Sequence, residues 1–137
     1  MNPKDENVEL ARRLYAALSR GDIEAFIDQI DPEVEFRSLI AEAEGKVYRG
    51  HQGMREWWAD VGQSLGVLEY EPEEFRAVGE DGLMIRVRVK GEVRDLPIEQ
   101  TMWQVARVGE QGPFWWQTFR SEDEALAELE RRQGEGR

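Results

Sequence analysis

The stretch "TMWQVARVGEQGPFWWQTF", residues 101–119, places the strongest constraint on the fold, because it carries large apolar side chains on both faces of a hairpin. Successive side chains of a strand point to opposite faces. Trp103 and Val105 therefore share one face and Met102 takes the other, while the adjacent Trp115 and Trp116 put rings on both. A strand that is apolar on both faces must be covered on both. We expect helices to cover one face and a second copy of the chain to cover the other.

Two further strands are expected before this hairpin. Residues 83–91, "LMIRVRVKG", alternate between apolar and basic side chains, which is typical of a strand with one solvated face. Residues 66–78 also alternate at first, and Pro72 predicts an edge strand or a bulge. Glu69 and Glu71 face the basic row, so cross-strand ion pairs are expected, each of small value for stability.

Helical periodicity dominates the first half of the chain. Residues 6–19 and 23–30 carry apolar stripes of helical spacing, with Asp22 as the expected cap of the second helix, and residues 54–65 carry a third stripe. Residues 33–38, "EVEFRS", predict a short strand between them. Ser121 and Glu124 form a capping box for a tail helix. This order predicts an α+β fold with helices on one face of a curved sheet.

Composition limits the function. A chain of 137 residues is the size of one domain, and we expect residues 6–132 of a single domain 1–137 to be ordered. A net charge of −11 repels phosphate backbones and anionic membranes, so neither nucleic acid nor a membrane is an expected partner. The absence of cysteine excludes thiolate catalysis and disulfides. The N-terminus lacks the features of a signal peptide, so a cytoplasmic location is expected.

Four pieces of the chain carry a resemblance to a known family through their order and spacing. They are "LYAALSRGDIEAF" (14–26), "DPEVEFRS" (31–38), "VYRGHQGMREWW" (47–58) and "MWQVARVGEQGPFWWQTFRSEDEALAEL" (102–129). Together they resemble the nuclear transport factor 2-like superfamily, and within it the SnoaL-like branch. The resemblance implies a cone-shaped α+β barrel, in which a strongly curved, mostly antiparallel sheet wraps around N-terminal helices. It further implies a pocket at the open end and a homodimer through the outer sheet face.

The resemblance implies several possible functions, because this fold hosts polyketide cyclases, ketosteroid isomerases, epoxide hydrolases, dehydratases and non-catalytic binding domains. The catalytic patterns of these branches match poorly. Phe36 stands where the isomerases carry their base, and Leu14 stands nearest to their oxyanion-hole tyrosine. The last strand offers Gln117 where the cyclases present an aspartate, and the Asp-Arg-Asp set of the epoxide hydrolases has no convincing counterpart.

Glu99 is the best candidate for a general base. It shares a strand face with Thr101, Trp103 and Val105. If that face lines the cavity, apolar neighbours would raise the pKa of Glu99 and suit the carboxyl group to proton transfer. A salt bridge or a place in the dimer interface is the alternative. Were Glu99 the base, Glu99→Gln would abolish turnover.

His51 and Tyr15 are candidate hydrogen-bond donors or acids at the pocket. His51, the only histidine, lies between Gly50 and Gly53 just before a helix, so the alternative is a loop or capping residue. A metal site is not expected, because one histidine lacks a clear set of partner ligands. Tyr15 could donate a hydrogen bond into the cavity or serve only as a core residue.

Two functions remain open. One is a homodimeric protein that binds an apolar small molecule, with cofactor-free isomerisation, cyclisation or dehydration as the chemistry if it is an enzyme. The other is a non-catalytic ligand-binding or dimerisation module. A deep pocket with a buried carboxylate favours the enzyme, and a pocket filled by tryptophan rings favours the module. The flap at 38–49, which carries Glu42 and Glu44, cannot be placed. The expected ligand-binding residues are Trp57, Trp103, Trp116, Phe36 and Gln117.

Overall fold

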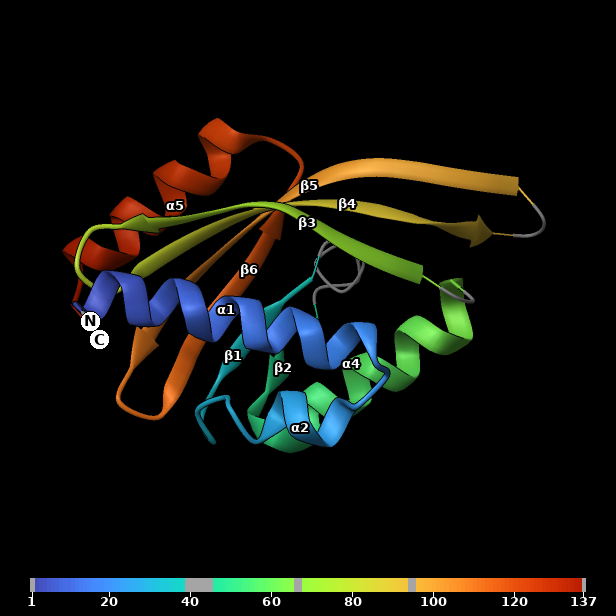
Figure 1. Ribbon diagram of the computed structural model, residues 1–137, viewed down its shortest axis with the longest axis horizontal. Helices are drawn as coiled ribbons and strands as arrows, with labels where there is room; N and C mark the ends of the chain where they lie inside the picture. The colour runs from blue at the N-terminus through green and yellow to red at the C-terminus, as the bar shows by residue number, and fades with distance from the viewer. Residues whose placement is uncertain (1, 39–45, 66–67, 94–95, 137) are drawn as a thin grey trace.

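The computed structural model describes residues 2–38, 46–65, 68–93 and 96–136, and it places helices on both sides of a curved sheet (Figure 1). The α+β fold expected from the sequence is confirmed, but the expectation that helices lie on one face only is wrong, because the last helix packs on the other face. In chain order the elements are α1 (Pro3–Ser19), α2 (Ile23–Ile27), β1 (Glu35–Arg37), β2 (Tyr48–Arg49), α4 (Gly50–Leu65), β3 (Leu68–Val78), β4 (Gly82–Val93), β5 (Leu96–Gly109), β6 (Gly112–Phe119) and α5 (Glu122–Gly134).

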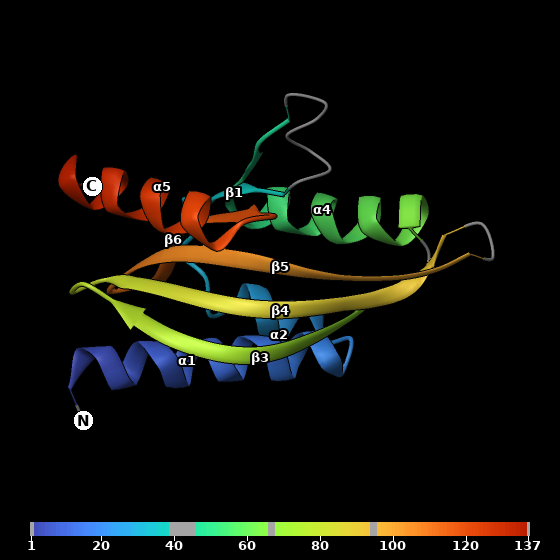
Figure 2. The same cartoon turned by 90° about the horizontal axis from the view of Figure 1, so that it is seen from above.

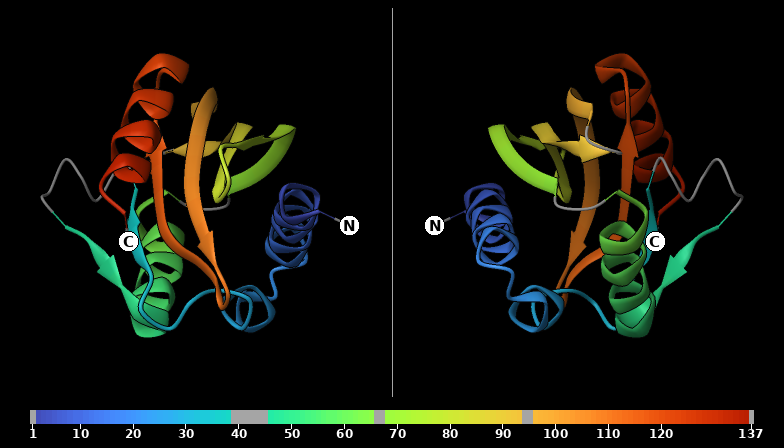
Figure 3. Two further views of the ribbon diagram at one scale, coloured as in Figure 1. Left: turned by 90° about the vertical axis from the view of Figure 1, so that its left-hand side faces the viewer. Right: turned by 90° about the vertical axis from the view of Figure 1, so that its right-hand side faces the viewer.

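The strands form one six-stranded sheet in the order β2-β1-β6-β5-β4-β3. The β1–β6 pair is parallel and the other neighbours are antiparallel, so the sheet is mostly antiparallel as expected. Figure 2 shows the long strands β3, β4 and β5 bending together, and Figure 3 shows α1 and α5 on opposite sides of them. The sheet is strongly curved and stays open at β2 and β3.

The first two helices differ in length from the periodic stretches that predicted them. The helix α1 begins at Pro3 because the Asn2 side chain accepts a hydrogen bond from the Asp5 amide at 3.0 Å and caps it. The Asp22 side chain caps α2 as expected, but that helix ends at Ile27. Ile30 lies outside it, because its amide donates a hydrogen bond of 3.0 Å to the Ile27 carbonyl, three residues back, as in a 3₁₀ turn. Ile30 is nevertheless buried. The apolar stripe at 23–30 therefore predicted the buried residues correctly, but it placed the end of the helix too late.

The main core lies on the concave face of the sheet, under α1, α2 and α4. It combines the apolar stripes of these helices with the inward-facing residues of β4, as expected from the alternation in residues 83–91. Burial of each large side chain contributes roughly 1.5–3 kcal/mol to folding. The fully buried residues of this core include Leu14, Phe26, Ile27, Ile30, Val34, Met54, Leu83, Ile85 and Val87.

A second core lies on the outer face and corrects the expected role of a partner chain. Trp115 and Val105 pack there against Ala125 and Leu129 of α5, and all four are buried. Ser121 caps this helix by accepting a hydrogen bond from the Glu124 amide at 3.4 Å. The tail helix of the same chain therefore covers Trp115 on the outer face of β6, so apolar residues on both faces of the hairpin do not by themselves require a second copy.

The strand β3 lies at the edge of the sheet and also contains a bulge between Pro72 and Glu74, so both alternatives offered for Pro72 are realised. The outer face of β3 and β4 carries the expected cross-strand ion pairs. Lys90 Nζ lies 3.2 Å from Glu71, and an Arg88 guanidinium nitrogen lies 3.1 Å from Glu73. These partly exposed pairs mark a solvated surface rather than a core.

Part of the expected flap, with Glu42 and Glu44, lies outside the described residues. No helix in the described ranges is both long and apolar enough to cross a membrane.

Candidate functional site

A cleft with a volume of about 670 Å³ opens where the end of α1 approaches α4 and the first half of β3. Its apolar walls are the rings of Trp58 and Tyr70 and the side chain of Leu18, and charged side chains surround them. Trp58 and Tyr70 are both half-buried, so their rings are partly accessible. The cleft is thus more polar than the hydrophobic pocket expected from the sequence. Its remaining lining residues are Ser19, Arg20, Gly21, Glu69, Glu71 and Lys90.

Aromatic rings fill the inner core behind this cleft. The ring centroid of Trp57 lies 5.9 Å from that of Trp58 and 6.4 Å from that of Tyr70, so Trp57 joins the cleft to the core. Phe36 lies 5.1 Å from Trp57 and 6.4 Å from Trp116. Three of the predicted ligand-binding residues, Trp57, Trp116 and Phe36, therefore lie together, but each is at most 5% exposed.

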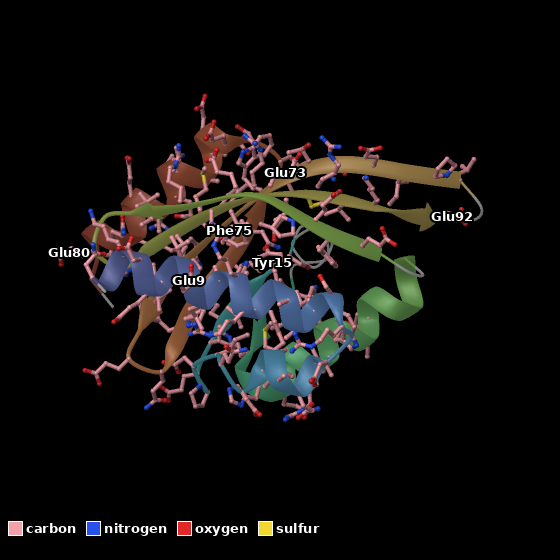
Figure 4. All side chains as sticks on the ribbon, in the orientation of Figure 1. Glu9, Tyr15, Glu73, Phe75, Glu80 and Glu92 are labelled. Carbon is pink, nitrogen blue, oxygen red and sulfur yellow. The ribbon has the colours of Figure 1, made fainter. Side chains whose placement is uncertain are left out.

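Tyr15 begins a buried line of neutral polar groups across this core. Its hydroxyl donates a hydrogen bond to the side-chain oxygen of Gln104, and the Gln104 amide nitrogen donates to Thr118 Oγ1 at 3.3 Å. Burial, and then the nearby Tyr70, raise the pKa of Tyr15 well above its ordinary value. Tyr15 therefore stays protonated and acts as a neutral donor. Figure 4 shows Tyr15 on α1 and Phe75 on β3 on neighbouring elements. Their ring centroids lie 5.9 Å apart.

Gln104 and Thr118 are polar residues of this site that the sequence reading missed. A signal was present, since Gln104 falls on the same strand face as Met102 and Ala106, which pack into the inner core. A polar residue among apolar ones on one strand face needs a hydrogen-bond partner when buried. Which face points inward was not decided from the sequence, so Gln104 could not be singled out.

Trp103 and Gln117 lie on the opposite side of the sheet from the other predicted ligand-binding residues. Trp103 packs against the outer core, and Gln117 pairs in register with the outward-facing Val105 and Arg37. The predicted ligand-binding set is therefore divided by the sheet. Trp103 and Gln117 do not join Trp57, Trp116 and Phe36 in one cavity.

Glu99 also lies on the outer face, which differs from the placement that its predicted role required. It stands opposite Lys90 in register, its side chain is 58% exposed, and it lies 3.4 Å from an Arg88 guanidinium nitrogen. The salt bridge offered as the alternative is thus present. Among the described residues Asp31 is the one buried carboxylate, and it accepts a hydrogen bond from the Glu33 amide at 2.8 Å in the loop after α2.

His51 links the start of α4 to the preceding loop. Its Nε2 atom lies 2.7 Å from the Ile30 carbonyl oxygen, at hydrogen-bond distance. Gly50 has a φ of +70°, and a Cβ at Gly53 would lie 2.9 Å from the Tyr48 backbone, so the glycines on both sides permit this tight approach. His51 is not among the cleft residues. No group of three acidic or histidine side chains in the described part of the chain is arranged to hold a metal ion.

The chain belongs to the family of SnoaL-like domains, whose model matches residues 11–129. No curated protein matches the sequence.

Solved structures share the fold at low identity. An NTF2-like protein of unknown function from Burkholderia pseudomallei superposes with a TM-score of 0.75 at 15% identity, covering 88% of this chain and 95% of that one. TerC, crystallised with polyporic acid, has a TM-score of 0.75 at 22% identity over 92% of this chain and 98% of its own. A putative polyketide cyclase from Sinorhizobium meliloti has a TM-score of 0.67 at 18% identity over 81% and 94%.

Proposed function

We propose that this protein binds a small molecule with a flat apolar ring in the cleft between α1, α4 and β3. The observation that carries this proposal is that two half-buried rings, Trp58 and Tyr70, line the same cleft of about 670 Å³. A cleft of this volume suits a ligand of drug-like size, and aromatic walls with a few polar groups are typical of such sites. Burial raises the pKa of Tyr70 to about 12, so its hydroxyl remains a neutral donor for the ligand.

The structural neighbours support a small organic ligand. TerC, a protein of the same fold, was crystallised with polyporic acid, which is a small molecule. TerC is 22% identical to this chain, so the similarity concerns the fold alone. The proposed class of ligand therefore rests on the residues that line the cleft.

Binding is favoured over catalysis by the charges around the cleft. The carboxylates that line it, Glu69 and Glu71, are exposed, and Glu71 is paired with Lys90 at 3.2 Å. An exposed carboxylate lacks the apolar surroundings that adapt a base to proton transfer near neutral pH. The inner core behind the cleft is filled by aromatic rings and by the hydrogen-bonded side chains of Tyr15, Gln104 and Thr118, all of them neutral. This filling supports a non-catalytic binding module rather than an enzyme.

A titration with 2-naphthol, a neutral flat aromatic probe, tests the proposal. We expect saturable binding, and we expect Trp58→Ala to weaken it about tenfold or more, because one aromatic wall is lost. Trp103→Ala is the matched control, since it removes the same ring from the outer face. Absence of binding, or equal weakening by both variants, would contradict the proposal.

We also propose a homodimer through the part of the outer face that α5 leaves uncovered. The supporting residues are Trp103 and Phe119, which are neighbours in register and only half-buried. Light scattering should give twice the chain mass for the wild type and the single mass for Trp103→Lys, because Arg86 stands opposite this position in register and a second cation cannot be buried there without a partner. A monomeric wild type would exclude this dimer.

A further inference from the structure

The charged residues that line the cleft of the proposed function fall into two groups. Glu71 and Lys90 are engaged with each other, since the lysine Nζ lies 3.2 Å from a carboxylate oxygen. Arg20 and Glu69 line the same cleft, but neither side chain makes an ion pair or a hydrogen bond within the described part of the chain. The lining therefore balances two cations against two carboxylates, and one charge of each sign is left free.

The free carboxylate does not follow from the strand pairing alone. Lys90 stands opposite Glu69 in register, and opposite charges at such a position usually pair. The lysine turns to Glu71 instead, so Glu69 keeps its charge without a partner. Glu69 and Arg20 do not pair with each other either, so the two free charges are separated by a gap within one cleft.

The two free charges reach the cleft from different elements. Arg20 is the C-cap of α1, and Glu69 is the second residue of β3, which is the edge strand of the sheet. Successive side chains of a strand point to opposite faces, but at an edge strand one ligand can contact both. Glu69 therefore lines the same cleft as its neighbour Tyr70, whose ring lies on the inner side. Both free side chains are exposed, so they can move to meet a ligand.

We propose that the ligand of this cleft is an aromatic zwitterion, namely an aromatic amino acid or a close analogue, in an inference that rests on the proposed function. Its ring lies against Trp58 and Tyr70, its carboxylate accepts hydrogen bonds from Arg20, and its ammonium group donates to Glu69. A ligand with one charge would leave the opposite free charge of the cleft unpaired, whereas a zwitterion pairs both. The net charge of −11 would repel an anionic ligand and does not oppose a neutral zwitterion.

Four probes that share one naphthyl ring separate the contributions of the two charges. Naphthylalanine is the zwitterion, naphthylethylamine carries the cation alone, naphthylpropionate carries the anion alone, and 2-naphthol is neutral. Calorimetric titration of the full-length protein near neutral pH should give the highest affinity for naphthylalanine. We expect an advantage of about threefold or more over each singly charged probe, since one exposed ion pair changes affinity by a factor of up to about five.

Two variants should produce a crossed pattern. Arg20→Gln should weaken the binding of naphthylalanine and naphthylpropionate about threefold or more and should not weaken that of naphthylethylamine. Glu69→Gln should weaken naphthylalanine and naphthylethylamine by a similar factor and should not weaken naphthylpropionate. Neither variant should change the affinity for 2-naphthol, which has no charge to lose. Trp58→Ala should weaken all four probes, because they share the ring.

Matched controls change the same charges outside the cleft. Arg120 and Glu80 are exposed and without an ion pair in the described residues, and neither lines the cleft. Glu80 lies beyond the other end of β3 (Figure 4). Arg120→Gln and Glu80→Gln should therefore leave all four affinities unchanged.

The outcomes for the zwitterion and for the proposed function are distinguishable. Binding of 2-naphthol without the crossed pattern, or with equal affinity for naphthylalanine and 2-naphthol, would overturn the zwitterion and leave the proposed function standing. Losses of the same size in the control variants would overturn it too, because they would show a general effect of net charge. Failure of all four probes to bind would exclude both.

Discussion

The hydroxyl of Tyr15 donates a hydrogen bond to the side-chain oxygen of Gln104, and this contact joins the first helix to the centre of the sheet. Gln104 passes the contact on to Thr118 of the neighbouring strand. Since both Tyr15 and Gln104 are at most 8% exposed, the line is shielded from water and its members depend on one another.

Each single substitution in this pair should therefore leave a buried polar group without its partner. The two losses in the free energy of unfolding should not be additive. Tyr15→Phe leaves the Gln104 oxygen without its donor, and Gln104→Leu leaves the Tyr15 hydroxyl without its acceptor. We expect each to lower the free energy of unfolding by roughly 1–3 kcal/mol, and the double variant to lose less than the sum. Urea unfolding of the four proteins measures this cycle, and strict additivity would show that the contact carries no coupling energy.

The sequence predicted the order of the elements apart from β2, and it predicted the inner core, because periodicity reports burial directly. The alternation in residues 83–91 placed the inward face of β4, and the stripes of the first two helices marked buried residues even where a helix ended early. It could not predict which face of β5 points inward, because both faces carry large apolar residues. That choice depends on α5, which packs on the outer face, and it separates Glu99 and Trp103 from the inner rings.

The candidate site was predicted only in part for the same reason. Trp57, Trp116 and Phe36 lie together in the inner core, and their role in ligand binding stays a prediction. The cleft itself is lined by Trp58, Tyr70 and Leu18, which come from three different elements. Contacts between elements that are distant in the chain leave no periodic signal in one sequence. The assignment of residues 1–137 to a single domain stays a prediction.

Alkaline pH should weaken the fold through its buried tyrosines. Burial raises the pKa of Tyr70 to about 12 in the folded protein, from an ordinary value of 10.0. Its contribution to the free energy of unfolding is therefore complete below pH 10 and is lost as the pH rises through 12. At pH 11 the loss attributable to Tyr70 is roughly 1 kcal/mol. Urea unfolding at pH 8 and pH 11 should show a smaller loss for Tyr70→Phe than for the wild type. Equal losses of stability in the wild type and in Tyr70→Phe would show that a group other than Tyr70 causes the change.

Arg107 should contribute more to stability than any exposed arginine of the sheet. Its side chain is 9% exposed, and Arg107→Gln would leave two carbonyl groups near the end of α5 without their donor and would remove the cation from Asp81, which would keep the hydrogen bond from Gln133. We expect a loss of at least roughly 2 kcal/mol in the free energy of unfolding. Arg86→Gln, which affects only half-exposed pairs with Glu73 and Glu74, should cost less than about 1 kcal/mol. Similar values for both variants would contradict the buried role of Arg107.

Glu99→Gln should have little effect, although the sequence alone made Glu99 the best candidate for a general base. Glu99 is exposed and paired only across the outer face, so the free energy of unfolding should change by less than about 0.5 kcal/mol. Affinity for 2-naphthol should also stay unchanged, because Glu99 does not line the cleft. Urea unfolding measures the first point and calorimetric titration the second, each beside the wild type, and a loss of affinity would contradict the position of Glu99 outside the cleft.

The position of bound 2-naphthol tests the central claim most directly. Intermolecular nuclear Overhauser effects between naphthol protons and assigned side-chain protons report contacts at the scale of one ring. We expect them to the rings of Trp58 and Tyr70, which wall the cleft. Contacts to Trp103 on the outer face instead, or to Leu96, which is 68% exposed at the start of β5, would contradict a ligand site in this cleft.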